Sequence, residues 1–244
     1  MDAKKPNKLT KQQAKEYDEL LSDIRRPKGR DYTNVSVTGR RRRGKSTLLA
    51  LLVKRIHAKF NAAGRQRKIL IVDLAPAKAF EDFQSFAAIK DLKRALALPI
   101  GHEDKWTDGI RKIKPHLGDM KEFVEVLVAY FRNGAIVWDE ANQFLERNGG
   151  LPDWQLPIFS ANGNMAIDNF ICTHRLMDIP KAIRTHIESF IIFAVDDPFT
   201  SAKDLAAAAF PGPHQEFFDT IQRAKNSLFN EDSRIKHYEV FNVN

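Results

Sequence analysis

Cysteine is almost absent from this 244-residue sequence, which contains one, Cys172. A single cysteine excludes an intramolecular disulfide framework and any zinc site built from several cysteines. The seven histidines show no spacing typical of metal ligands. The sequence therefore does not belong to the classes of protein that disulfides or structural zinc hold together.

Long apolar runs are also missing. No stretch approaches the ~20 apolar residues that a membrane-spanning helix needs, and the first residues lack the apolar segment of a secretory signal. We therefore expect a protein without a membrane partner that works in the cytoplasm. If the source is a virus, this is the host cytoplasm, and association with the virion is a further option.

Acidic residues are scarce in one part of the chain only. Residues 1–45 contain 14 Lys and Arg against 6 Asp and Glu, whereas the remaining residues contain 25 of each. The whole formal net charge of +8 therefore comes from the first segment. A localised basic segment favours a polyanionic partner, although a solvated polar tail explains the first ten residues equally well.

What the sequence does contain is a glycine-rich loop between an apolar run and a helical pattern. Residues 39–46, named the glycine loop below, fill the pattern G-x-x-x-x-G-K-[ST] with Gly39, Gly44, Lys45 and Ser46 at its fixed positions. β-branched residues precede the loop and leucines at helical spacing follow it, which is the context that this motif requires. The pattern predicts a loop whose backbone N–H groups surround the phosphates of a nucleotide.

The residue types in this loop suit phosphate chemistry. Glycines allow a close approach of the backbone, and the first turn of the following helix, which contains Thr47, directs free N–H groups at an anion. Lys45 is expected to reach the β and γ phosphates, and Ser46 to bind Mg²⁺. Arg42 and Arg43 are candidate phosphate contacts, since a guanidinium matches phosphate oxygens, or else solvated side chains. We expect ATP and Mg²⁺ as cofactors.

A second informative stretch is the apolar run 134–138, which ends in Asp139 and Glu140. Ligands bind at the carboxyl ends of strands in an open α/β sheet. Given the glycine loop upstream, Asp139 is predicted to complete the Mg²⁺ site opposite Ser46, and Glu140 to act as general base on the attacking water. The alternative is that the two acids only cap a helix.

Five apolar strands are expected near residues 34, 68, 135, 169 and 189, separated mostly by helical patterns. This order predicts an α/β fold with a doubly wound, mostly parallel sheet and helices on both faces. We divide the chain into a basic extension with an amphipathic helix (1–32), a core (33–195) and a helical or edge-strand extension (196–244).

Two local predictions come from spacing alone. Large apolar residues recur at every third position after residue 76: Phe80, Phe83, Phe86 and Ile89. This spacing predicts one face of a helix. Residues 179–184 predict a short helix with Pro180 in its first turn, and we interpret Arg184 on that helix as a surface residue.

Three features occur together in an order that resembles the FtsK/HerA superfamily of P-loop ATPases: the glycine loop, the pair Asp139-Glu140, and Thr173-His174-Arg175 followed by Ile179-Pro180. The resemblance covers residues 33–195. Within the superfamily, the chain looks most like the genome-packaging ATPases of tailless icosahedral viruses and large DNA viruses. From Asp139 to Phe193 it is also similar to the zonula-occludens-toxin-like assembly ATPases of filamentous phages.

The resemblance implies a RecA-like P-loop NTPase fold and an ATP-driven ring of five or six copies that moves double-stranded DNA. It places His174 where the superfamily usually has a glutamine that senses the γ-phosphate, with Arg175 beside it in the catalytic set. A neighbouring subunit usually inserts an arginine from the segment before this strand, but residues 151–169 contain no arginine. The candidates are therefore Arg147, Arg175, Arg184 and the loop residues Arg40 to Arg43.

We therefore interpret the chain as a Mg²⁺-dependent ATPase that translocates double-stranded DNA and packages a viral genome into a preformed capsid, with capsid vertex proteins as further candidate partners. A nucleotide-driven virion assembly protein and a cellular HerA-type DNA translocase are the alternatives. A nucleotide or metabolite kinase fits less well, since a glutamate placed to polarise water favours hydrolysis.

Overall fold

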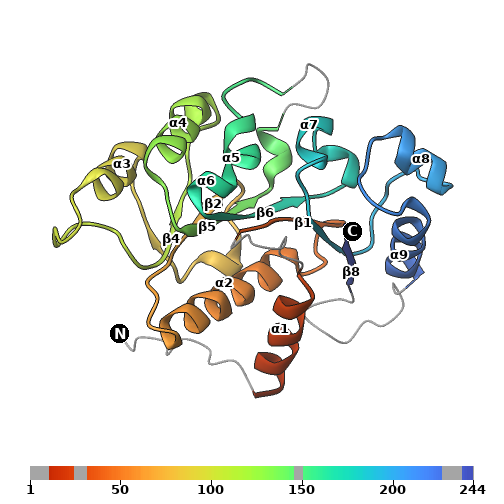
Figure 1. Ribbon diagram of the computed structural model, residues 1–244, viewed down its shortest axis with the longest axis horizontal. Helices are drawn as coiled ribbons and strands as arrows, with labels where there is room; N and C mark the ends of the chain where they lie inside the picture. The colour runs from red at the N-terminus through yellow and green to blue at the C-terminus, as the bar shows by residue number, and fades with distance from the viewer. Residues whose placement is uncertain (1–10, 25–31, 146–150, 227–237, 244) are drawn as a thin grey trace.

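The computed structural model describes residues 11–24, 32–145, 151–226 and 238–243. Its centre is an eight-stranded sheet of order β3-β4-β2-β5-β6-β1-β7-β8 (Figure 1). The strands are β1 (Asn34–Thr38), β2 (Lys68–Asp73), β3 (Gln84–Ser85), β4 (Gly109–Ile113), β5 (Gly134–Asp139), β6 (Ile167–Thr173), β7 (Ser189–Ile192) and β8 (Glu239–Asn242). All pairs are parallel except β7 with β8. The predicted mostly parallel α/β sheet is confirmed.

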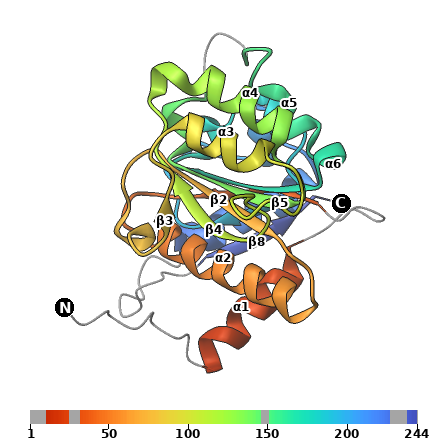
Figure 2. The ribbon, with the colours of Figure 1, turned by 90° about the vertical axis from the view of Figure 1, so that its left-hand side faces the viewer.

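Helices cover both faces of the sheet, as Figures 1 and 2 show. The α-helices are α1 (Lys11–Asp23), α2 (Lys45–Ala62), α3 (Ile89–Ala97), α4 (Met120–Tyr130), α5 (Leu156–Ser160), α6 (Asn162–Met165), α7 (Lys181–Arg184), α8 (Ala202–Ala207) and α9 (His214–Asn226). The 3-10 turns are η1 (Lys78–Phe80), η2 (Leu117–Asp119), η3 (Ala141–Gln143) and η4 (Leu176–Asp178). None of the described helices combines the length and apolarity that crossing a membrane requires.

The central strands are buried on both sides, and β2 shows why their sequences are continuously apolar. Successive side chains of a strand point to opposite faces. Ile69 and Ile71 therefore pack with α1 and α2, whereas Leu70 and Val72 join the cluster formed with α3 to α9. A strand between two helical layers needs apolar residues at every position rather than at alternate ones.

The topology brings the carboxyl ends of three strands together on one side of the sheet. Parallel strands place their carboxyl ends on the same side, so β1, β5 and β6 all end there. In the sheet, β6 lies between β1 and β5. Thr173 at the end of β6 is in register with Thr38 at the end of β1, and their hydroxyl oxygens are 3.1 Å apart.

The helix face predicted after residue 76 is wrong. Phe80 ends the 3-10 turn η1, Phe83 and Phe86 lie on either side of the short edge strand β3, and only Ile89 begins a helix. Phe80 and Phe86 are buried on opposite faces of the sheet. The chain wraps around the sheet edge here, and burial on two faces produced a spacing that resembles that of one helix.

The two ends of the described chain pack against this core. Leu20 on α1 and Ile24 just after it are buried in the α2 layer. At the other end, Phe241 of β8 stacks on Phe217 of α9, with ring centroids 4.3 Å apart. In the basic N-terminal segment, residues 1–10 and 25–31 lie outside the described residues. The predicted domain boundaries stay predictions.

Candidate active site

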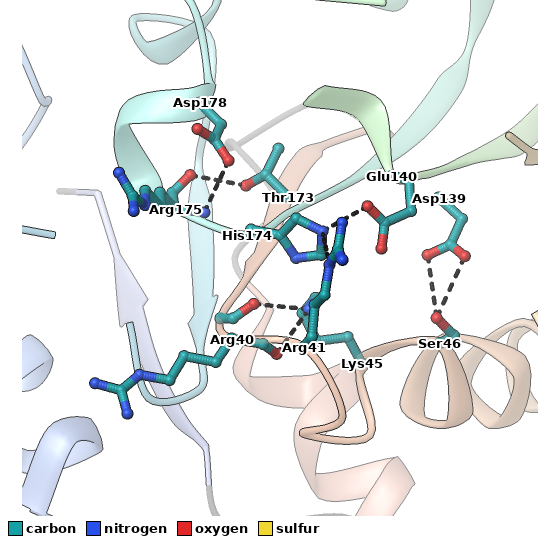
Figure 3. A network of polar contacts seen from close by, with 11 residues as sticks. Arg40, Arg41, Lys45, Ser46, Asp139, Glu140, Thr173, His174, Arg175 and Asp178 are labelled. Atoms are coloured by element: carbon teal, nitrogen blue, oxygen red, sulfur yellow. Dashed lines mark hydrogen bonds and ion pairs between the residues drawn. The ribbon is translucent and has the colours of Figure 1, made fainter. Parts of the chain in front are cut away.

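The glycine loop connects β1 to α2 and is fixed to the neighbouring strands by its backbone (Figure 3). The Gly39 N–H donates to the Thr173 carbonyl at 3.3 Å, and the Arg40 N–H donates to the Ala194 carbonyl at 2.8 Å. A Cβ atom on Gly39 would lie 2.4 Å from the Cβ of Phe193, so space requires glycine at this position. Gly44 has a φ of 90°, so conformation requires glycine there.

Lys45 is held inside the loop. It is the first residue of α2 and only 6% exposed. Its Nζ donates to the carbonyls of Gly39 at 2.7 Å and Arg40 at 3.0 Å. An anion that entered the loop would meet this ammonium group together with the N–H groups of the first turn of α2. Thr47, the third residue of that turn, is half-buried.

Ser46 and Asp139 are in direct contact across the loop. The Ser46 hydroxyl lies 3.2 and 3.3 Å from the two carboxylate oxygens of Asp139. Burial raises the pKa of Asp139 to about 6, and the charge of Glu140 adds to the increase, while hydrogen bonds from Cys172 and Ser46 oppose it. A divalent cation beside this carboxylate would favour its ionised form.

The oxygen atoms of Ser46 and Asp139 fit Mg²⁺. This cation commonly takes one or two protein oxygens and completes its shell with phosphates and water. Within the described ranges, His, Cys, Asp and Glu form no group of three that could hold a metal ion by itself. The donor set therefore suits a cation that arrives with a phosphate ligand better than a cation held by protein alone.

Asp73 is an acidic residue near this site that the sequence interpretation did not assign. It ends β2 in register with Asp139, and its side chain accepts the Ala77 N–H at 3.1 Å. Burial raises its pKa. The available signal was the same as for Asp139, an acidic residue at the end of an apolar strand.

Glu140 points toward His174 rather than toward Ser46 (Figure 3). The Glu140 Oε2 atom lies 2.6 Å from the Nε2 atom of His174, and Glu140 has a left-handed backbone with a φ of 55°. The Nε atom of Arg41 lies 3.4 Å from the same imidazole nitrogen. The structure therefore joins the predicted base, the residue at the predicted sensor position and a loop arginine.

The arginines around the site occupy different environments. Arg175 is exposed and lines a cleft of about 550 Å³ together with Arg40, Arg41, His174, Asp178 and Asp196. Arg40 is paired with Asp196, a carboxylate that the sequence interpretation did not assign to the site. Arg42 is exposed and Arg43 half-buried, and their predicted phosphate contacts stay predictions. Arg147 lies outside the described residues.

The interpretation of Arg184 as a surface residue is wrong. Arg184 is 5% exposed, and its guanidinium donates to the carbonyls of Ile179 at 2.7 Å, Met177 at 3.3 Å and Ala208. The guanidinium carbon also lies 4.5 Å from the ring centre of Phe210. Arg184 therefore joins α7 to the segment after α8, and it is not available for insertion into another subunit.

The chain has the α/β fold of the RecA-like P-loop NTPases. Among solved structures, it is similar to the genome packaging NTPase B204 from Sulfolobus turreted icosahedral virus 2. The sulfate complex of that protein aligns with a TM-score of 0.59 at 12% identity over 88% of this chain and 92% of that chain. The ATP-gammaS complex aligns with a TM-score of 0.55 at 11% identity over 87% and 98%.

The resemblance to genome-packaging ATPases is thus confirmed at the level of fold. The N-terminal domain of zonular occludens toxin from Neisseria meningitidis aligns less well, with a TM-score of 0.40 at 14% identity over 73% of this chain and 91% of that chain. No protein-family model matches the sequence, and a comparison with curated proteins finds no match. Residue roles must therefore be argued from this chain's own geometry.

Proposed function

We propose that this chain is an ATP-hydrolysing motor that translocates double-stranded DNA and packages a viral genome into a preformed capsid. The observation that carries the proposal is the contact between Ser46 and Asp139, 3.2 Å across the mouth of the glycine loop. A loop lysine, a hydroxyl and a buried carboxylate gathered at strand ends suit a magnesium nucleotide. The fold shared with a genome packaging NTPase that has been solved with ATP-gammaS supports the same proposal.

Each residue has a separate task in the proposed reaction. Lys45 exchanges its bonds to the loop carbonyls for the β and γ phosphates, while Ser46 and Asp139 hold the cation. Mg²⁺, when bound with ATP, neutralises charge on the transferring phosphate. Glu140 is the general base that orients the attacking water and accepts its proton. In this proposal an arginine from a neighbouring subunit completes the site, and our candidate is Arg175, which is exposed and lines the cleft.

Double-stranded DNA is the proposed track. The structural neighbour is a genome packaging NTPase, and the excess of basic residues in positions 1–45 favours a polyanion. If DNA is the track, double-stranded DNA raises the ATPase rate of the purified full chain. The stimulation weakens as salt rises from about 50 to 200 mM, because phosphate contacts release counterions.

The matched control is Lys45→Ala, which removes the ammonium from the loop and should lose activity with or without DNA. The DNA part of the proposal would be overturned if DNA did not stimulate the ATPase activity and the protein showed no salt-dependent binding to DNA. That result would favour a virion assembly protein. A chain that binds no ATP would overturn the proposal as a whole.

A further inference from the structure

Glu140, the proposed general base, is paired with His174. The two side chains are 21% and 18% exposed, and their contact is 2.6 Å. A carboxylate that is ionised can only accept hydrogen bonds, so Nε2 of His174 must carry the proton. Nε2 then has no lone pair for Arg41, although the Nε atom of Arg41 lies 3.4 Å away. In this arrangement the carboxylate, and not the guanidinium, is the partner of the imidazole.

This pairing holds Glu140 away from the centre of the loop. Asp139 points to Ser46, whereas Glu140 points to the tip of β6 (Figure 3). A general base must lie within hydrogen-bond reach of the water it activates. A carboxylate oxygen engaged by His174 is a weaker acceptor for that water, so the nucleotide-free arrangement is not the arrangement suited to hydrolysis.

His174 itself is held lightly. Its other ring nitrogen, Nδ1, is buried and has no hydrogen-bond partner among the described residues. The imidazole also lines the cleft that contains Arg40, Arg41 and Arg175. A terminal phosphate between Lys45 and the tip of β6 would lie beside Arg41 and would compete with Glu140 for the Nε2 proton.

We propose that His174 is a positioning residue that holds Glu140 aside in the nucleotide-free chain and releases it when the γ-phosphate of ATP becomes the partner of the imidazole. This inference rests on the proposed ATPase function. The switch depends on the terminal phosphate, so ATP opens the pair and ADP leaves it closed. Arg41, beside the same nitrogen, becomes a second donor to that phosphate.

Nuclear magnetic resonance of ¹⁵N-labelled histidine side chains tests the contact between Glu140 and His174, and its replacement by phosphate, without any turnover. The signal of His174 is assigned as the one that is lost in His174→Gln. In the nucleotide-free chain, Glu140→Ala should shift the Nε2 signal of His174 and leave that of the exposed His116 unchanged. ADP with beryllium fluoride should shift the wild-type signal, and ADP alone should not. No shift with Glu140→Ala, or no shift with bound ADP and beryllium fluoride, would overturn the inference.

A double-mutant cycle on nucleotide affinity provides the functional test. If the γ-phosphate must displace Glu140 from His174, Glu140→Ala frees the imidazole and should tighten binding of a non-hydrolysable ATP analogue by on the order of 10-fold, with no matching gain for ADP. In a His174→Ala background, the same change should alter analogue affinity by less than about threefold, because the pair is already absent. His174→Gln keeps an N–H donor for the carboxylate and should retain most of this coupling.

The results separate this inference from the proposed function. His116→Ala is the matched control and should match wild type. If His174 had a merely structural role, Glu140→Ala would change the affinity for the ATP analogue by the same factor in both backgrounds, which would overturn the inference while the ATPase function stands. Normal turnover by Glu140→Gln would instead remove the assignment of the base, and absence of nucleotide binding would remove the function.

Discussion

At the scale of single residues, the proposed function predicts that a change at Glu140 separates nucleotide binding from hydrolysis. Glu140→Gln removes the proton acceptor but keeps the size of the side chain and leaves the loop, Lys45 and Ser46 intact. We expect near wild-type affinity for ATP and a loss of kcat of about 10²- to 10⁴-fold. Fluorescent-nucleotide binding and single-turnover hydrolysis measure the two quantities separately. Equal losses in both would show that Glu140 is needed for binding rather than as a base.

Arg184 offers a second prediction at this scale, for stability rather than activity. Arg184→Ala removes hydrogen bonds to buried carbonyls and a contact with the ring of Phe210. We expect the free energy of unfolding to fall by about 2–3 kcal/mol, with a smaller loss for Arg184→Lys because lysine lacks the planar fork. Urea denaturation measures both. An unchanged midpoint combined with lost ATPase activity would return Arg184 to the list of catalytic arginines.

The structure brings together several of the predicted site residues because their positions depend on local pattern. Gly39, Gly44, Lys45 and Ser46 lie in one loop, and the end of an apolar strand marked Asp139. In contrast, the environments of His174 and Arg184 depend on elements far away in sequence. The partner of His174 directly follows β5, and a partner of Arg184 follows α8, so spacing along the chain carried no signal for either.

At the scale of elements, the attachment of α1 to α2 depends on one carboxylate. Asp18 accepts hydrogen bonds from Arg55 at 2.8 Å and is paired with Lys59 at 2.9 Å, and these cations hold its pKa well below the usual range. Because the pKa is lower in the folded state, this contribution to stability is present above the unfolded value of about 3.9 and is lost as pH falls below it.

The corresponding variant is Asp18→Asn. We expect it to lower the free energy of unfolding at pH 7 by about 0.5–1 kcal/mol, since the pair is partly exposed. The difference from wild type should shrink as pH falls below about 3.9 and disappear only once pH falls below the lowered pKa of Asp18 in the folded state. Glu19→Gln is the matched control, because Glu19 is paired only with Lys15 among described residues and both side chains are largely exposed. A loss that is independent of pH would assign the effect to packing rather than charge.

The sequence pattern predicted the helices and strands whose side chains are buried in one consistent way along the element. It failed at the edge of the sheet. The apolar runs that became β2, β5 and β6 were evident because both sides of each are buried. At the edge near β3, Phe80 and Phe86 are drawn to different faces. A periodicity argument assumes one buried face and therefore fails there.

At the scale of the whole molecule, the order of the strands in the sheet could not be predicted from the sequence pattern. The alternation of strands and helices predicted a parallel sheet, but nothing local indicates that β6 inserts between β1 and β5. This insertion decides the chemistry of the site, because it places His174 between the glycine loop and the acidic pair. It also directs Arg175 into the exposed cleft instead of the protein interior.

The exposed position of Arg175 leads to a prediction about assembly. If Arg175 serves the nucleotide site of a neighbouring copy, Arg175→Ala and Lys45→Ala chains are each inactive alone but complement each other when mixed. In a random mixture of equal amounts, about a quarter of the interfaces join an intact loop to an intact Arg175, as follows for head-to-tail contacts in a ring. Specific activity of wild type should also rise with protein concentration as copies associate.

The mixing experiment needs a control for nonspecific effects of removing a surface arginine. Arg65→Ala serves this purpose, because Arg65 is exposed at the opposite end of the sheet, just before β2, and the variant should be active alone. Arg175 and Lys45 variants that stay inactive at every mixing ratio, although copies exchange, would place Arg175 in the site of its own chain. The arginine from the neighbour would then be sought among Arg40 to Arg43 of the glycine loop, of which Arg40 and Arg41 line the cleft.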